Sequence, residues 1–86
     1  MDLKNKKVLI TGATGGIGNS LINKFHSLGS KILATGTNEE KLKKLKLNYS
    51  GIHVEKFRLD EHDKIESFIN TVETKLDGIE ILVNNA

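Results

Sequence analysis

The sequence predicts an α/β fold in which a parallel sheet carries helices on both faces. Short apolar segments alternate with segments whose apolar residues recur every three or four positions, a pattern typical of strands alternating with amphipathic helices. A glycine-rich segment leads directly from the first strand into the first helix. The 86 residues are enough for one small domain, and no internal repeat or linker divides them.

The first strand and the first helix flank this glycine-rich segment. Residues 7–10 form a short apolar run, which suits a strand buried on both faces. The helix that follows has one apolar stripe at steps of four, four and three residues, formed by Ile17, Leu21, Phe25 and Leu28. Gly29 ends this helix, and residues 31–35 form the second strand.

A capping box predicts the start of the second helix. Thr37 is placed to cap the helix, and Glu40 stands three residues later, where its side chain can reach back to the cap. This helix ends near Gly51. Residues 52–59 then predict a third strand, whose more polar character is typical of the edge of a sheet.

A third helix and a fourth strand complete the pattern. Asp60 is placed to cap the helix, whose apolar stripe is formed by Ile65, Phe68, Ile69, Val72 and Leu76. Residues 79–83 predict a fourth strand that is apolar on both faces. Right-handed crossovers put the first two helices on one face, and the third on the other if the fourth strand returns beside the first. The expected fold is the N-terminal half of a Rossmann-like doubly wound parallel sheet, with strand order 3-2-1-4.

Composition excludes several classes of function. The chain has 13 Lys and Arg against 11 Asp and Glu, and a net charge of +2 is too small to predict a nucleic acid or a membrane as partner. It has no Cys, and its three His are far apart in sequence, so no metal site is expected. There is neither a long apolar run nor a signal-peptide core, and we expect a cytoplasmic protein.

The glycine-rich segment, residues 11–18, predicts a site for a nucleotide phosphate. Gly12 allows a sharp turn after the strand, while Gly16 and Gly18 allow close approach of a pyrophosphate and close packing of the helix. A Walker A loop is excluded because Asn19 follows Gly18, and a G-x-G-x-x-G loop because residue 21 is Leu21. A tight turn with a purely structural role is the alternative.

The end of the second strand bears on the choice of cofactor. Dinucleotide sites that prefer NAD usually place an acidic residue there, and this chain has none. Thr37 and Asn38, with Lys41 nearby, are suited to hold a 2′-phosphate, which predicts NADP. Glu39 and Glu40 argue in the other direction, so NAD stays open.

With Asn84-Asn85-Ala86 at its end, the chain resembles the short-chain dehydrogenase/reductase superfamily over its whole length. Gly12, Gly15 and Gly18 also fit the extended branch of the superfamily, and the Asn-Asn-Ala segment favours the short branch. Residues 31–36 and 81–86 are most similar to the N-terminal part of bacterial beta-ketoacyl acyl-carrier-protein reductases. The resemblance implies NAD(P)-dependent reduction of a carbonyl in fatty acid biosynthesis.

The loop and the resemblance together predict one set of cofactor contacts. They are Gly12, Thr14, Gly15, Gly16, Ile17, Gly18, Thr37, Asn38, Leu59, Asn84 and Ala86. At the position of Arg58, relatives often carry an Asp that accepts from the adenine amino group, which Arg58 cannot do. Asp60 is a substitute acceptor, although its role as a helix cap is the better interpretation.

The catalytic groups of the superfamily do not match residues of this chain. The family uses a Ser and a Tyr with a Lys four residues later, whereas the one Tyr, Tyr49, is followed at that spacing by His53. We therefore expect an incomplete segment that is inactive alone and aggregation-prone or partly molten, with the full-length protein a candidate homo-oligomer. The alternatives are a stand-alone interaction module that pairs through its open sheet edge, and a decayed reading frame.

Overall fold

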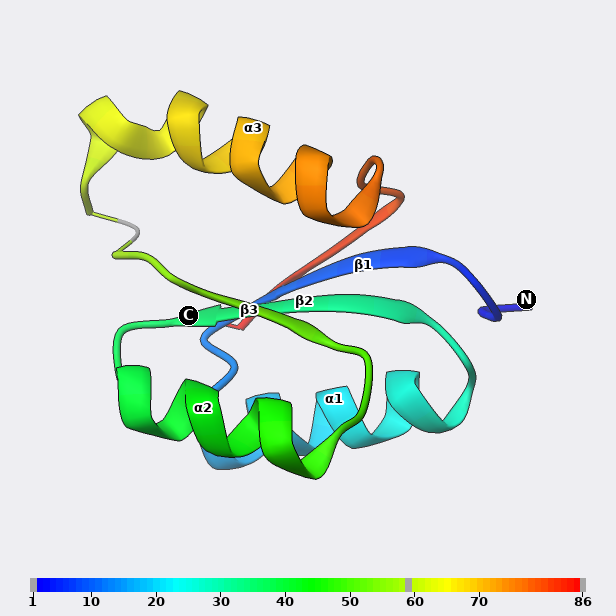
Figure 1. Cartoon of the computed structure of the whole chain (residues 1–86). Helices are drawn as coiled ribbons and strands as arrows, with labels where there is room; N and C mark the ends of the chain where they lie inside the picture. Colours follow the sequence, from blue (N-terminus) through cyan, green and yellow to red (C-terminus); the bar gives the residue numbers. More distant parts are fainter. Residues whose placement is uncertain (1, 59, 86) are drawn as a thin grey trace.

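A four-stranded parallel sheet lies between two layers of helices in the computed structural model, which describes residues 2–58 and 60–85 (Figure 1). The strands are β1 (Lys7–Thr11), β2 (Lys31–Gly36), β3 (His53–Lys56) and β4 (Ile81–Asn84). The helices are α1 (Gly16–Ser27), α2 (Glu39–Asn48) and α3 (Ile65–Leu76), with a short 3-10 turn η1 (His62–Lys64) before α3. The strand order is β3-β2-β1-β4, which confirms the predicted topology.

The sheet separates two apolar cores. β1 pairs with β2 and β4 so that Val8 lies beside Ile32 on one side and Ile81 on the other. Alternate strand residues face opposite layers, because successive side chains of a strand point to opposite faces. Val8, Ile10 and Ile32 therefore pack under α1 and α2, whereas Leu9 and Leu33 pack under α3. Figure 1 shows α1 and α2 on one face of the sheet and α3 on the other, as predicted.

The apolar stripe predicted for α1 is rotated in the structure. Ile22 is fully buried, while Ile17 is 71% exposed and Leu28 is 40% exposed. The reason is Gly18, whose backbone lies so close to the turn after β1 that a Cβ at this position would be only 2.5 Å from the carbonyl oxygen of Gly12. The helix approaches the sheet most closely on the Gly18–Ile22 side, so the predicted stripe forms only the flank of the buried face.

The capping box predicted for α2 is wrong by one residue. Asn38, not Thr37, is the N-cap, and its side-chain oxygen accepts a hydrogen bond from the backbone N–H of Lys41 at 3.0 Å. Asn is as good a cap as Thr, and its oxygen here reaches the third amide of the helix. Thr37 consequently keeps an exposed side chain without a capping role.

The segment between β3 and α3 also differs from the prediction. β3 covers His53–Lys56 only, rather than 52–59. Asp60 caps no helix, because its carboxylate pairs with the Arg58 guanidinium at 3.2 Å. This partner holds the pKa of Asp60 below its ordinary value, chiefly through the hydrogen bond. The turn η1 intervenes before α3, which begins without a side-chain cap.

β4 forms an edge of the described sheet. It runs over Ile81–Asn84 instead of the predicted 79–83, and it pairs with β1. Ile81 and Val83 are half-buried beneath the α1 layer, while Leu82 is 61% exposed. α3 therefore leaves its face of the sheet partly uncovered at Leu82. Within the described residues, no helix has the length and apolarity needed to cross a membrane.

Candidate functional site

The glycine-rich turn joins the carboxyl end of β1 to the start of α1. Gly12 has φ of 61°, a left-handed conformation that favours glycine. The amide of Ala13 donates to the carbonyl of Thr35 at 3.0 Å, which ties the turn to β2. The first backbone bond of α1 runs from Asn19 N–H to Gly15 at 2.9 Å, so the preceding helical amides have no intrahelical acceptor.

The start of α1 differs from those of the other two α-helices. It has neither a side-chain cap nor an acidic residue in its first turn. The first turn of α2 carries Glu39 and Glu40, and that of α3 carries Glu66. No carboxylate in the first turn of α1 therefore neutralises the positive end of the helix dipole. The backbone N–H groups there have no intrahelical acceptor, so they are suited to bind an anionic group.

The glycines at this helix start have different roles. A Cβ at Gly16 would meet nothing within 4 Å, and the residue is exposed. Gly18, by contrast, is buried, and a Cβ there would lie 2.5 Å from the Gly12 oxygen and 2.7 Å from the Ala13 Cα. Gly18 is therefore required by packing within the chain. The fold itself makes no such demand at Gly16, which leaves open space where an external group can approach.

A hollow of about 200 Å³ lies beside the turn. It is lined by Thr11, Gly12, Thr14, Thr35, Gly36, Thr37 and Phe57. Gly36 makes room for Thr14, since a Cβ at Gly36 would lie 3.0 Å from the Thr14 methyl carbon. Thr35, Gly36 and Phe57 were not among the cofactor contacts predicted from the sequence. Their position at and just after the carboxyl ends of β2 and β3 is the signal that would have found them.

A hydrogen-bond network fixes the turn against β4. The Thr11 hydroxyl is buried, donates to the side-chain oxygen of Asn84 at 2.9 Å and accepts from the amide of Asn85 at 3.1 Å. The side-chain amide of Asn85 donates to the Gly12 carbonyl at 3.2 Å. Asn85, which was not among the predicted cofactor contacts, thus positions the turn, and the side-chain oxygen of Asn84 is already engaged.

The structure brings most of the predicted contacts to one end of the sheet. Gly12, Thr14 and Thr37 line the hollow, and Gly15, Gly16 and Ile17 are exposed at the start of α1. Gly18 is buried behind them, and Asn38 caps α2. Leu59 and Ala86 lie outside the described residues.

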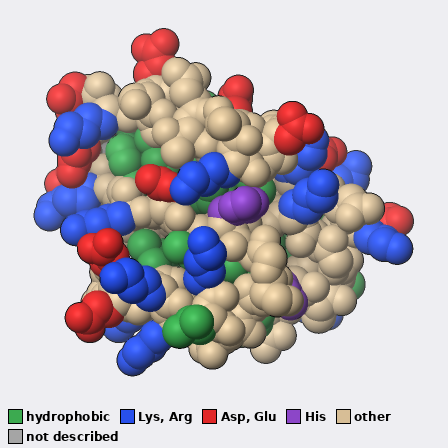
Figure 2. Space-filling view, in the orientation of Figure 1, with side chains coloured by type: hydrophobic (Ala, Val, Ile, Leu, Met, Phe, Trp, Pro, Cys, Tyr) green, Lys and Arg blue, Asp and Glu red, His purple; other side chains and the backbone are tan. Residues whose placement is uncertain are grey.

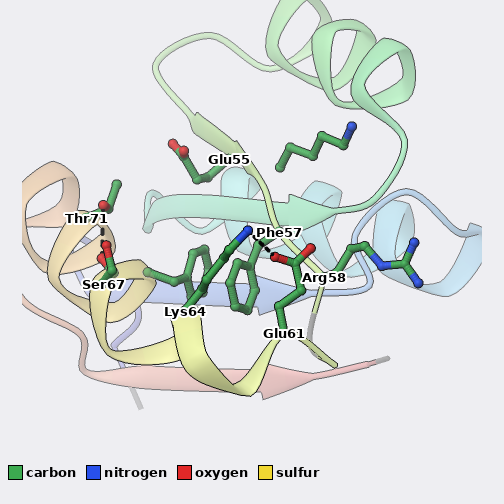
Figure 3. A pocket seen from close by; sticks show the side chains of 9 residues that line it. Glu55, Phe57, Arg58, Glu61, Lys64, Ser67 and Thr71 are labelled. Carbon is green, nitrogen blue, oxygen red and sulfur yellow. Dashed lines mark hydrogen bonds and ion pairs between the residues drawn. The ribbon is translucent and has the colours of Figure 1, made fainter.

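A larger hollow lies elsewhere, between the end of β3, η1 and α3 (Figure 3). Its volume is about 430 Å³, and Phe57 and Phe68 stack within it at a centroid distance of 4.1 Å. Lys64 pairs with Glu61 at 3.0 Å, and Arg58 extends away from the other labelled side chains. This hollow lacks the open helix start found at the glycine-rich turn, so its size does not make it the better phosphate site.

Three other observations bear on what the described surface can bind. Basic and acidic side chains are interspersed on the face seen in Figure 2, with small apolar areas between them. No cluster of three or more potential metal ligands occurs among residues 2–58 and 60–85. Tyr49 packs against the core under α1 and α2, stacks edge-on against His26 and donates to the side-chain oxygen of Asn19 at 3.3 Å.

The sheet order, the glycine-rich turn and the open start of α1 define a nucleotide-binding type of α/β fold. The chain belongs to the short chain dehydrogenase family, whose model matches residues 6–86. Membership in this family favours an oxidoreductase segment over a stand-alone interaction module.

Individual relatives agree with this assignment. The chain is 40% identical over 90 residues to a "3-oxoacyl-[acyl-carrier-protein] reductase FabG" of Rickettsia prowazekii (strain Madrid E), covering 100% of this chain and 34% of the relative. It is 37% identical to "Nodulation protein G" of Rhizobium sp. (strain N33), covering 99% and 35%. A crystal structure of a short chain dehydrogenase from Bacillus anthracis superposes with a TM-score of 0.89 at 31% identity, covering 100% and 36%. The chain spans about a third of the length of these relatives.

Proposed function

We propose that this chain is the dinucleotide-binding segment of a short-chain oxidoreductase that reduces a carbonyl, with NADP as its cofactor. The carbonyl belongs to the class named for the Rickettsia relative, a 3-oxoacyl group on an acyl carrier protein. A cytoplasmic protein that binds neither nucleic acid nor membrane is part of the same proposal. The observation that carries it is the uncapped, acid-free start of α1, with open space at Gly16, beside the hollow of about 200 Å³.

The residues of the turn fit the parts of such a cofactor. The amides at the start of α1 are suited to bind the pyrophosphate, because they have no intrahelical acceptor. The adenosine ribose belongs beside Gly36 and Thr37, and Phe57 offers an apolar surface for the adenine. The cofactor supplies a hydride when it is bound, and the residues of this chain hold it in place.

The end of β2 supports NADP over NAD. Gly36 and Thr37 line the hollow there without a carboxylate, so nothing acidic meets the ribose hydroxyls. Glu39 and Glu40, which argue for NAD from the sequence, do not line this hollow. The side-chain oxygen of Asn38 is engaged as a cap, which leaves its NH2 group as the available donor.

Carbonyl reduction needs groups beyond those of the described site. Tyr49 is engaged with Asn19 and packs on the core under α1 and α2, away from the residues that line the hollow. Since the relatives are about three times as long, we propose that a further segment of the protein supplies the proton donor and the substrate pocket.

Isothermal titration of the chain with NADP tests the binding proposal. Gly16→Val should weaken binding about tenfold or more, which corresponds to about 1.4 kcal/mol, because the new side chain occupies the open space at the helix start. Its far-UV circular dichroism should be unchanged, since a Cβ at Gly16 meets nothing within 4 Å. Asn23→Val, at an exposed position on the same helix, is the matched control and should bind as the unmodified chain does. Equal affinity in all three proteins would contradict the site.

A further inference from the structure

β3 is an edge strand, since β2 is its one neighbour in the described sheet. The N–H of Phe57 donates to the carbonyl of Gly36 at 3.0 Å, so this residue and those at steps of two along the strand turn their peptide groups toward β2. The peptide groups of Val54 and Lys56 therefore point away from the sheet and are open to a further strand. Figure 1 shows β3 in front of β2, with α2 on one side of it and α3 on the other.

A hollow flanks this edge on each face of the sheet. On the α2 side, a hollow of about 270 Å³ has Leu42 and Val54 in its wall. On the α3 side lies the hollow of about 430 Å³ in which Phe57 and Phe68 stack. Lys56 lines both hollows. Successive side chains of a strand added to this edge would point to opposite faces, so they would enter the two hollows in alternation.

The charges beside the edge indicate what such a strand should carry. Lys43 and Lys56 line the α2-side hollow, and neither forms an ion pair within the described part of the chain. Of the two acidic residues in the same wall, Glu55 is paired with Lys75 at 2.6 Å, which leaves Glu39. One positive charge is thus in excess beside the edge, and an acidic residue on the added strand would complement it.

A second copy of β3 fits this edge poorly. When two β3 edges pair antiparallel about a two-fold axis, each face of the sheet continues into the same face of the other copy. The second copy would bring its His53 and Glu55 to the aromatic hollow, and its Lys56 to the side of Leu42. Registers centred on Glu55 or on Lys56 would also set like charges opposite each other. Polar groups would meet apolar walls, which disfavours self-pairing.

We propose that the edge of β3 binds an extended segment of another protein by strand addition. The segment has apolar residues on both of its faces, with the aromatic ones toward α3, and an acidic residue beside Lys56. Its backbone pairs with the outward peptide groups of Val54 and Lys56. This interaction surface does not depend on the dinucleotide proposal, and neither result decides the other.

A blocked peptide of about eight residues, the length of an ordinary strand, tests the proposal. Val and Phe alternate at its centre, and Asp stands at both ends. Added to the isotope-labelled chain, it should shift the amide signals of Val54 and Lys56 in a saturable manner and leave that of Gly16 unchanged. The same peptide with Lys in place of Asp should bind about two- to fivefold more weakly, the range of an exposed ion pair. The absence of saturable shifts, shifts centred on other elements, or equal affinity of the two peptides would overturn the proposal.

Two variants at one position isolate the contribution of the backbone. Lys56→Thr removes the side chain, whereas Lys56→Pro removes the side chain and the outward N–H. Proline is tolerated on an edge strand where the N–H faces away from the sheet, so the two variants should have the same melting temperature. Lys56→Thr should weaken binding of the Asp peptide about two- to fivefold, and Lys56→Pro a further five- to tenfold or so.

Equal affinity of the two variants would overturn strand addition. If Lys56→Pro has a lower melting temperature, the amide shifts of the unmodified chain decide the question alone. Shifts at Val54 that depend on the concentration of the chain without peptide would overturn the choice of another protein as partner, because they would show self-pairing.

Discussion

Replacing Gly18 by Ala should destabilise the chain, although alanine is the better helix former. The added Cβ would lie 2.5 Å from the Gly12 oxygen, 2.7 Å from the Ala13 Cα and 2.9 Å from the Ala13 carbonyl carbon. All three are backbone atoms, so no side chain can rotate away to relieve the contact. The start of α1 or the turn itself must move, by about half an ångström or more, as in an overpacked core.

The size of the effect follows from two opposing contributions. Overpacking costs about 1–3 kcal/mol, and the helix propensity of Ala returns up to about 1 kcal/mol. The net loss should be about 1–2 kcal/mol in the free energy of unfolding, a large share of the stability of a domain of this size. Gly16→Ala, which adds the same methyl group two residues earlier in open space, should be neutral or slightly stabilising.

Urea unfolding followed by far-UV circular dichroism measures both variants. The midpoint should fall for Gly18→Ala and stay the same or rise for Gly16→Ala, with the denaturant slope unchanged. A Gly18→Ala variant as stable as the unmodified chain would refute the reasoning, because it would mean that α1 does not pack on the turn as described.

Three further substitutions test other parts of the structure. Asn38→Ala should cost about 1 kcal/mol of unfolding free energy through the lost cap, while Thr37→Ala should cost much less. If thermal melts show the larger loss for Thr37→Ala, Thr37 is the cap after all. Thr11→Val should cost about 0.5–1.5 kcal/mol, because it removes the buried hydroxyl that bonds the Asn84 side chain and the Asn85 amide at the end of β4, and an unchanged melting temperature would count against that network. Lys6 holds the pKa of Glu80 below its ordinary value, so this pair should contribute stability above about pH 4.5 and lose it as the pH falls further. Glu80→Gln should reduce the fall of the melting temperature with decreasing pH in this range. If the variant and the unmodified chain have the same dependence of melting temperature on pH, the Lys6–Glu80 pair is not the cause of that fall.

Sequence periodicity predicted the order of the elements because each strand and helix carries its own apolar pattern. It failed where close packing or the path of the backbone, rather than apolar spacing, decides the outcome. The α1 stripe is rotated because Gly18 packs on Gly12, a contact that no spacing of apolar residues records. The α2 cap shifted from Thr37 to Asn38 because both residues are good caps, and only the path of the chain after β2 decides between them.

The sequence predicted the local part of the site and missed the part that forms only when the strands come together. The glycine-rich turn combines its signals within a few residues, so its place between β1 and α1 followed directly. The hollow beside it depends on three strand ends that are adjacent only in the folded sheet, which is why Thr35 and Phe57 were missed. Asn85 acts through the Gly12 carbonyl, a contact across the β1–β4 pair that appears only with the register.

The measurement that tests the central claim most directly is an amide chemical-shift map of the chain during titration with NADP. We expect the largest, saturable shifts at Gly16, Ile17 and Thr37. The amide chemical shifts of Ser67 and Thr71, which lie at the larger hollow on α3, should not change. The absence of saturable shifts at the start of α1, or shifts centred on α3 instead, would contradict the proposed dinucleotide site.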